Sequence, residues 1–152
     1  MPDRALSVTE RMFLFEARRA VLATIAPDGR PRLVPICFVL DPARPVLWTP
    51  LDEKSKAVDD VAQLARVRDI RVDARVTVLV DRWDEGWTQL AWLRCHGTAS
   101  IVDPGGSADE RDAAMSALRA KHPQYALHDL ETRPMIRIEL VRTVSWGALT
   151  LP

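Results

Sequence analysis

Lysine is scarce in this chain of 152 residues: three of its 21 basic residues are lysine and the rest are arginine. Basic and acidic residues balance at 21 each, so the formal net charge is zero. Proteins that bind nucleic acid or membrane surfaces broadly usually carry a basic excess. The composition therefore predicts no nucleic-acid partner and no membrane partner, and it confines any anion site to a local cluster.

Long apolar runs are missing as well. No stretch approaches the roughly 20 apolar residues that a membrane-spanning helix needs, and the first residues lack the basic flank and apolar segment of a signal peptide. Cysteine occurs only twice, at Cys37 and Cys95, far apart in the sequence. Without an export signal we expect a cytoplasmic protein whose two thiols are free and buried.

The familiar motifs of catalysis and metal binding are also absent. The sequence has no Gly-x-Ser-x-Gly nucleophile elbow, no Cys-x-x-Cys pair, and no Gly-x-Gly-x-x-Gly or Walker-type loop. Cys95 and His96 are neighbours in a predicted strand, so their side chains point to opposite faces. His122 and His128 lie on either side of Pro123, where we expect the surface. We therefore predict no metal site, and the catalytic residues stay unassigned.

Hydrophobic periodicity predicts a single mainly β domain over residues 1–152. Apolar alternation and turn residues indicate strands, and a spacing of three and four indicates helices. Ser7 with Glu10 and Ser107 with Glu110 fit the capping box that begins a helix, and Gly97 marks a bend or bulge. The predicted strands are 20–26, 32–40, 46–49, 76–81, 87–102 and 135–146, and the predicted helices are 7–19, 57–70 and 107–121.

These elements fit an antiparallel β-barrel of six strands with peripheral helices. The first three strands are joined by connections too short for the crossovers of a parallel sheet. Closing the sheet into a barrel also removes its exposed edges.

One loop has the residues of an anion site. Two of the three lysines lie two positions apart, at Lys54 and Lys56, on either side of Ser55 and shortly after a strand that ends at Thr49. Hydroxyl and ammonium groups donate to phosphate, and a helix predicted from Ala57 adds a favourable dipole. A solvated loop in which neighbouring carboxylates neutralise the lysines explains the same spacing equally well.

Tryptophan is the commonest aromatic residue, with five copies against one tyrosine. Four of them, Trp48, Trp87, Trp92 and Trp146, fall in or beside predicted strands. Packing in the core explains most of them. Trp87 and Trp92 are an odd number of residues apart, so a regular strand would send one to the core and the other to a pocket or a partner.

The order of these segments resembles a known superfamily. Residues 20–26 (AVLATIA) are followed by residues 28–36 (DGRPRLVPI), then by Leu-Trp-Thr and Lys-Ser-Lys, by residues 73–80 (DARVTVLV), and by Gly-Thr-Ala at 97–99. This order is similar to the flavin-binding split-barrel superfamily that includes the pyridoxamine 5'-phosphate oxidases. Within it, the chain resembles small actinobacterial enzymes that use the deazaflavin coenzyme F420. The resemblance extends over roughly residues 7–147.

The resemblance implies a six-stranded split barrel that forms a homodimer with the cofactor at the interface. It also implies hydride transfer to or from a small-molecule substrate, which is chemistry that the cofactor supplies. The resemblance further implies that the cofactor phosphate is bound by Thr49, Lys54, Ser55 and Lys56. The same resemblance assigns the cofactor ring to Arg32, Val34 and Pro35 on one strand and to Val78, Leu79 and Val80 on another, with Trp87 and Trp92 near the dimer side and Trp146 near the pocket.

Two alternatives remain open beside coenzyme F420. FMN presents a phosphate to the same loop, so an FMN-dependent oxidoreductase fits the same residues. A non-catalytic protein that binds a flavin or haem fits them too. The last residues carry no basic cluster like the one with which pyridoxamine-phosphate oxidases hold their substrate, which argues against that substrate. A longer segment at 103–130 is a candidate to cover or shape the pocket.

Overall fold

The computed structural model describes residues 6–51 and 64–150 of the chain. Their strands form one antiparallel sheet in the order β2-β1-β5-β6-β7-β4-β3. The strands are β1 (Ala20–Ile25), β2 (Pro31–Ile36), β3 (Val39–Leu40), β4 (Val46–Pro50), β5 (Arg75–Arg82), β6 (Ala91–Val102) and β7 (Met135–Gly147). The helices are α1 (Val8–Glu16), α2 (Ala65–Val72) and α3 (Ala108–Lys121), with short 3-10 helices η2 (Trp87–Gln89) and η3 (Pro123–Leu127).

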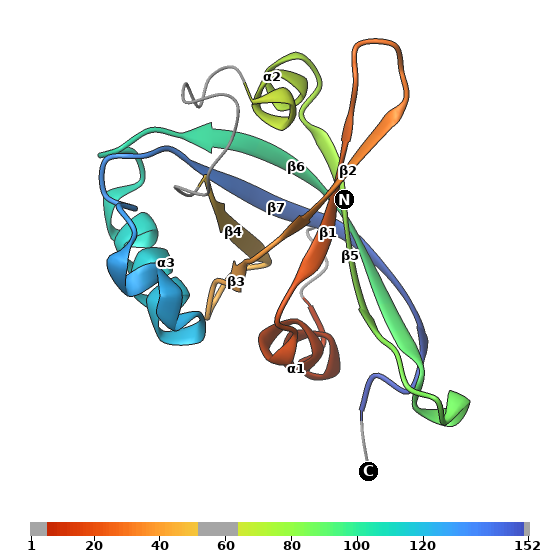
Figure 1. Cartoon of the computed structure of the whole chain (residues 1–152). Helices are drawn as coiled ribbons and strands as arrows, with labels where there is room; N and C mark the ends of the chain where they lie inside the picture. The colour runs from red at the N-terminus through yellow and green to blue at the C-terminus, as the bar shows by residue number, and fades with distance from the viewer. Residues whose placement is uncertain (1–5, 52–63, 151–152) are drawn as a thin grey trace.

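The sheet curls into a half-barrel because its two edges are joined in the chain. β2 pairs with β1 at one end of the sheet order, and β3 pairs with β4 at the other. Only Cys37 and Phe38 separate β2 from β3, so the two edges come together there and diverge on either side (Figure 1). The mainly β fold with peripheral helices is thereby confirmed, and the curled half-barrel is consistent with a split barrel. The expectation that closure removes the sheet edges is wrong for the described residues, because β2 and β3 remain edge strands.

The predicted number of six strands is wrong, because the described residues contain seven. Residues 32–40 do not form one strand: β2 and β3 have different partners. Apolar residues continue through the exchange of partners, since Phe38 is fully buried between the two strands. Periodicity reports which residues are buried and not which strand they pair with, so it could not find this break.

The long strand β6 bends where the sequence predicts. The register between β6 and β7 shifts between His96 and Gly97. A Cβ atom at Gly97 would lie 2.5 Å from the backbone oxygen of Glu139, so a side chain cannot be accommodated there without a shift of the backbone. A bulge of this kind increases the local twist of the sheet and helps it to curl.

The start of β6 differs from the prediction. Residues 87–89 form the 3-10 helix η2, and the strand begins only at Ala91. The backbone oxygen of Gln89 accepts a hydrogen bond of 2.9 Å from Arg82 Nε, and the backbone nitrogen of Leu90 donates to the oxygen of Trp87. The backbone oxygens of Trp87 and Gln89 are therefore bonded to Leu90 and Arg82 and not to a neighbouring strand. Trp87 lies before the β6 ladder.

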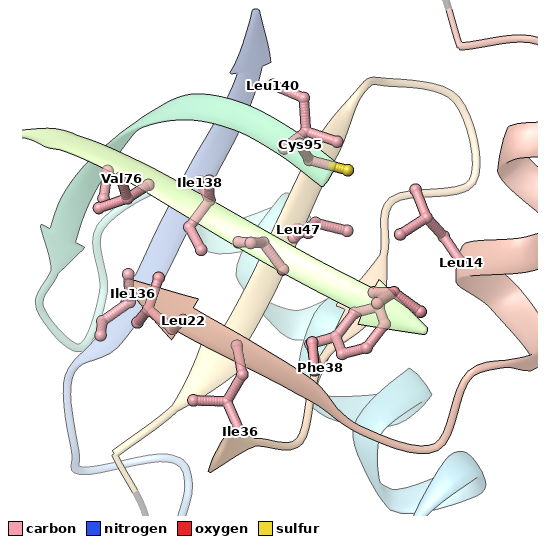
Figure 2. Close-up of a cluster of buried hydrophobic side chains, with 14 of the residues drawn as sticks. Leu14, Leu22, Ile36, Phe38, Leu47, Val76, Cys95, Ile136, Ile138 and Leu140 are labelled. Carbon is pink, nitrogen blue, oxygen red and sulfur yellow. The ribbon is translucent and has the colours of Figure 1, made fainter. Parts of the chain in front are cut away.

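Two apolar clusters hold the fold together. The larger fills the inside of the half-barrel and is closed by α1, with Leu14, Phe38 and Cys95 among its buried members (Figure 2). The smaller lies between β4 and α3 and contains Trp48 and Leu118. At about 25 cal/mol for each Å² of apolar surface removed from water, such clusters supply most of the folding free energy.

The helix boundaries test the two predicted capping boxes. At α1 the box is confirmed: the Glu10 backbone nitrogen donates to Ser7 Oγ at 3.0 Å and the Ser7 nitrogen donates to Glu10 Oε1 at 2.9 Å. At α3 it is wrong. Ser107 precedes the helix with φ of 48° and makes no capping bond, whereas a capping side chain needs an extended backbone. The predicted helix start at residue 57 lies outside the described residues.

Candidate functional site

The two diverging sheet edges frame the predicted site. β2 is at one end of the sheet order, and the last residues of β4 come close to the other end. Thr49 lies in β4 opposite Ile136 of β7 and is 2% exposed. The remaining residues of the predicted phosphate loop, Lys54, Ser55 and Lys56, lie outside the described residues. The structure therefore positions this loop only through the strand from which it leaves.

Two arginines that the sequence did not indicate fix the point where that strand ends. Arg133 Nε donates to the backbone oxygen of Leu51 at 2.6 Å. Arg111 of α3 donates in turn to the backbone oxygen of Arg133 at 2.6 Å. The first of these bonds joins residues 82 positions apart. No local pattern could have revealed it, although its effect is to anchor the start of the predicted loop.

Arg32 of β2 forms an ion pair with a buried carboxylate. Its Nε lies 2.7 Å from Asp69 Oδ2, and Asp69, which belongs to α2, is 2% exposed. Thr24 of β1 donates to the same oxygen at 2.8 Å. Two charge-assisted bonds thus meet at one oxygen of the carboxylate and fasten α2 to β1 and β2. The side chain of Arg32 keeps 41% of its surface exposed, so the rest of it faces outward from this end of the half-barrel.

The other two predicted residues of β2 point to opposite faces, as alternation along a strand requires. Val34 is half-buried and packs against the larger core cluster, whereas Pro35 is exposed. Because β2 is an edge strand, its backbone groups away from β1 are paired with no described strand. Pro31 and Pro35 fit this position, since proline is tolerated on edge strands.

The three predicted residues of β5 divide in the same way. Val78 and Val80 are buried in the core, and Leu79 is 38% exposed on the outer face. At Val78 and Leu79, β5 pairs with β1 on one side and with β6 on the other. The backbone groups of these two residues therefore face neighbouring strands and not a ligand. Val80 has a pairing partner only in β6 and borders a pocket of about 240 Å³ beneath α1. Of the three, Val80 therefore has the backbone best placed to meet a ligand.

The tryptophans separate into a core residue and an exposed group. Trp48 is 1% exposed in the smaller cluster. Trp87 in η2 is 72% exposed, and the half-buried Trp92 in β6 stands directly opposite Trp146, which is 53% exposed. Trp83, which the sequence did not single out, is 68% exposed just after β5. The outer end of β5, β6 and β7 thus carries a group of aromatic side chains that the described residues leave exposed or only half-buried.

The cysteine and histidine residues form no nucleophile pair. Cys95 is fully buried and free, and burial, followed by the charge of Glu10, raises its pKa to about 12. His96 lies on the opposite face with Nδ1 3.2 Å from Thr77 Oγ1. Its pKa is lowered by burial and then by Arg142 and Arg94. The predicted separation of the two side chains is confirmed, and so are two free thiols, although Cys37 is only half-buried.

One histidine prediction is wrong. His122 is 6% exposed, because it lies between the end of α3 and η3 with its ring 6.0 Å from that of Tyr125. Within residues 6–51 and 64–150, no cluster of three His, Cys, Asp or Glu side chains has an arrangement that would hold a metal ion. Over the same residues, no helix has the length and apolar character needed to cross a membrane.

A comparison with models of known families gives a match over residues 9–147 to pyridoxamine 5'-phosphate oxidase. The chain belongs to this family. The match covers nearly all of the described structure, from α1 to the end of β7. The matched range therefore includes every strand of the half-barrel and nearly all of its helical residues.

Solved structures with the same split-barrel fold have varied descriptions. A conserved hypothetical protein from Mycobacterium tuberculosis is 24% identical, with a TM-score of 0.71 over 100% of this chain and 92% of its own. An F420 reductase is 20% identical, with a TM-score of 0.61 over 88% of this chain and 94% of its own. HutZ, the heme storage protein from Vibrio cholerae, is 14% identical, with a TM-score of 0.65 over 90% and 89%. At these identities the likeness shows the fold alone.

In this member of the family, the segment 103–130 packs away from Arg32 and Asp69. α3 and η3 cover β4 and β3 and form the smaller core cluster. Arg111 holds the segment in place by donating to the backbone oxygens of Val102 and Leu130 as well as that of Arg133. The segment supports the strand that leads to Lys54 and Lys56, and it borders a separate pocket on its other side.

Proposed function

We propose that this protein is an oxidoreductase that depends on the deazaflavin coenzyme F420 and transfers hydride to or from a small organic substrate. The observation that carries the proposal is the family match over residues 9–147. Cys95 is buried with a raised pKa, and the described residues contain no cluster of three His, Cys, Asp or Glu side chains that would hold a metal ion. Chemistry supplied by a bound ring cofactor accounts for a site without such residues.

The described residues fit a phosphorylated ring cofactor. The outer backbone edge of β2 pairs with no described strand, and a flat polar ring can donate to and accept from such an edge. Thr49 is the next-to-last residue of β4, the strand that leads towards Lys54, Ser55 and Lys56, and Arg133 anchors the end of that strand through Leu51. Thr49 is almost fully buried, so it offers little surface to a phosphate at the strand end.

In the proposed complex, Thr49, Lys54, Ser55 and Lys56 hold the phosphate, and Arg32, Val34 and Pro35 lie along the ring. The Asp69 carboxylate fixes Arg32 Nε and leaves the outer part of its guanidinium available. Val80 offers backbone groups, whereas the side chains of Val78 and Val80 only support the strand. When bound, a deazaflavin supplies two-electron hydride transfer, and the protein supplies binding, orientation and exclusion of water.

A homodimer with the cofactor at its interface is part of the proposal. The exposed tryptophans Trp83, Trp87 and Trp146 support it, because aromatic residues are enriched in interfaces and costly to leave in water. Sedimentation of the wild-type chain should give the mass of a dimer. Replacing both Trp87 and Trp146 by serine should shift it towards the monomer, and a monomeric wild-type chain would contradict this part.

The direct test of the cofactor is titration with oxidised and reduced coenzyme F420, FMN and haem. Saturable binding of F420 supports the proposal, and absence of binding to both of its redox states contradicts it. An FMN spectrum in the purified protein would favour the FMN-dependent oxidoreductase, which the family match also supports. Tight binding of flavin or haem with no turnover of unsaturated acceptors would favour a storage protein, the role described for HutZ.

A charge variant tests the proposed phosphate loop. Lys56→Ala should weaken cofactor binding about 10- to 150-fold, which corresponds to the roughly 1.5–3 kcal/mol of a charge-assisted hydrogen bond. Arg30→Ala is the matched control, because it removes an exposed cation in the turn between β1 and β2. Equal cofactor affinities for both variants and the wild type would mean that Lys56 does not bind the phosphate and belongs to a solvated loop.

A further inference from the structure

A second pocket lies between α1 and α3, with β3 at its base. Figure 1 shows β3 between the two helices. The pocket has a volume of about 430 Å³, within the range of about 300–1,000 Å³ that is usual for small-molecule sites. Its lining is mostly apolar, with charged side chains at the α1 and α3 ends. The lining residues are Phe15, Glu16, Arg18, Val39, Leu40, Ala117, Ala120 and Lys121.

Lys121, the third lysine of this arginine-rich chain, closes one end of the pocket. It is the last residue of α3 and is half-buried. Its Nζ donates to the backbone oxygen of Phe38 at 3.0 Å and lies 4.1 Å from the centre of the Phe38 ring. These two contacts hold the ammonium group at the edge of β3. They use one of its three N–H donors.

Arg18 brings a second positive charge to the same place. Its guanidinium donates to the backbone oxygen of Lys121 at 2.7 Å. Burial, followed by the charge of Arg18, lowers the pKa of Lys121 to about 8, and nearby Cys37 opposes this shift. In the part of the chain that the structure describes, no carboxylate forms an ion pair with Lys121 or Arg18. Two neighbouring cations beside an apolar pocket thus have no ion-pair partner among the described residues.

Two features oppose an anion here. Glu16 lies on the pocket wall and is exposed like Arg18, so water screens both of these charges, whereas Lys121 is half-buried. The carbonyl end of α3 carries about half a negative charge, and Arg18 already binds one of its oxygens. The remaining local charge is positive.

We propose that this pocket binds a small organic acid, with its carboxylate on Lys121 and Arg18 and its apolar body against Phe15, Val39 and Leu40. Charge complementarity selects the carboxylate, because each cation keeps N–H donors that the fold does not use. The apolar lining selects a hydrocarbon or aromatic body over a sugar or a free phosphate. The pocket shares no lining residue with those assigned to the proposed cofactor site, although Glu16 also borders the smaller pocket beside Val80.

Isothermal titration with octanoate tests the proposal, with octan-1-ol as the uncharged control of equal chain length. Octanoate should bind saturably at one site, and at least about tenfold more tightly than the alcohol, which is the effect of one charge-assisted bond. Lys121→Met should remove that preference. Arg19→Gln should leave it unchanged, because Arg19 is an exposed cation next to Arg18 that does not line the pocket. Equal binding of the acid and the alcohol to the wild type would overturn the proposal.

A second variant removes the pocket and keeps both charges. Ala120 is exposed on α3 and lines the pocket, so Ala120→Phe should fill it without disturbing the core. This variant should lose octanoate binding about tenfold or more while its unfolding stays unchanged. Unaltered octanoate binding in Ala120→Phe would place the acid elsewhere on the surface and overturn the assignment.

The pH dependence provides a separate readout. The ammonium form of Lys121 binds the carboxylate, so octanoate affinity should fall as the pH rises through about 8, while octan-1-ol affinity stays level. The other charged or titratable groups around this end of the pocket are Arg18, Glu16 and Cys37. Cys37→Ala should therefore keep the profile, and a profile that follows Cys37 would overturn the role of Lys121.

Titration of the same variants with coenzyme F420 separates this inference from the proposed function. Lys121→Met and Ala120→Phe should bind the cofactor like the wild type, since neither residue belongs to the proposed cofactor site. Octanoate should likewise bind equally with and without the cofactor. Competition between the two ligands would show a single shared site and overturn a separate one.

Discussion

The two ends of the half-barrel hold a buried charge in different ways. At the α2 end, Asp69 is 2% exposed and accepts from the side chains of Thr24 and Arg32. At the α3 end, Arg111 is also 2% exposed, yet it meets no carboxylate in the described structure. Its guanidinium lies within hydrogen-bonding distance of four backbone oxygens, those of Val102, Leu130, Glu131 and Arg133.

The difference indicates what each end does. An ion pair with a half-exposed arginine can reorganise when a ligand arrives, because water and the ligand can replace one partner. If a guanidinium bound to four carbonyls moves away, all four carbonyl oxygens lose a hydrogen-bond donor. Buried polar groups without a hydrogen-bond partner destabilise the fold. We infer that the α3 end is a fixed support and that the α2 end, beside the proposed cofactor, is the adaptable one.

The largest expected effect comes from Arg111→Met. The variant keeps the apolar stem but removes every hydrogen bond to the four carbonyls, so we expect a loss of about 3–5 kcal/mol of unfolding free energy. Urea unfolding followed by circular dichroism measures it. Arg68→Met, on the exposed face of α2, is the matched control and should change stability by less than about 0.5 kcal/mol. Similar losses in both variants would remove the distinction between the two ends.

Asp69→Asn should have a smaller effect. The amide keeps the shape and can still accept from Thr24, but Arg32 loses its counter-charge, so we expect a loss of about 1–3 kcal/mol. A double-mutant cycle with Arg32→Met isolates the coupling between the two side chains. A coupling energy of zero would mean that the pair contributes only geometry. Cofactor titration of the same variants shows whether the pair also positions the ring.

Lys121, at the α3 end, should make the free energy of unfolding depend on pH in the alkaline range. Its pKa falls from 10.5 to about 8 in the folded protein, so between these values the unfolded chain binds more protons. Stability contributed by this group is therefore reduced below pH 8 and recovers as the pH rises from 8 to 10.5. The difference in unfolding free energy between wild type and Lys121→Met should change in this interval. A constant difference in unfolding free energy between pH 8 and 10.5 would contradict the lowered pKa of Lys121.

Glu131 should give the smallest effect, because it is exposed. The hydrogen bond from Arg119 lowers its pKa from 4.5 to about 2. A carboxyl with a lowered pKa contributes stability above its ordinary pKa, and that contribution is lost as the pH falls towards 2. In Glu131→Gln, the free energy of unfolding should therefore fall slightly less steeply than in the wild type as the pH drops towards 2. An unchanged acid limb would show that water screens the pair completely.

Sequence patterns predicted most of the elements because each pattern reports a local preference. The alternation of Val76, Val78 and Val80 found β5, and the Ser7–Glu10 box found the start of α1. Gly97 was recognised as a bulge from its place within an apolar strand. The same local reading failed at Ser107, where the preceding glycines lead the chain into a left-handed turn, and at Trp87, where a turn uses the backbone.

The candidate site was less predictable, because its supports join residues far apart in the chain. The pairs Arg32–Asp69 and Arg133–Leu51 link positions 37 and 82 residues apart. Which residue meets Asp69 depends on how α2 sits over β1 and β2. The pocket between α1 and α3 likewise exists only once both helices flank β3.

The sequence by itself determined a zero net charge, the two cysteines, the order of the elements and the concentration of lysines in one loop. These follow from composition and from contacts among near neighbours. The tertiary structure alone decided that one predicted strand becomes two, that Arg111 and Arg133 support the strand leading to the lysine loop, and that Lys121 stands beside Arg18 over a pocket. The physical reason is that burial and charge–charge distance depend on which distant residues the curled sheet brings together.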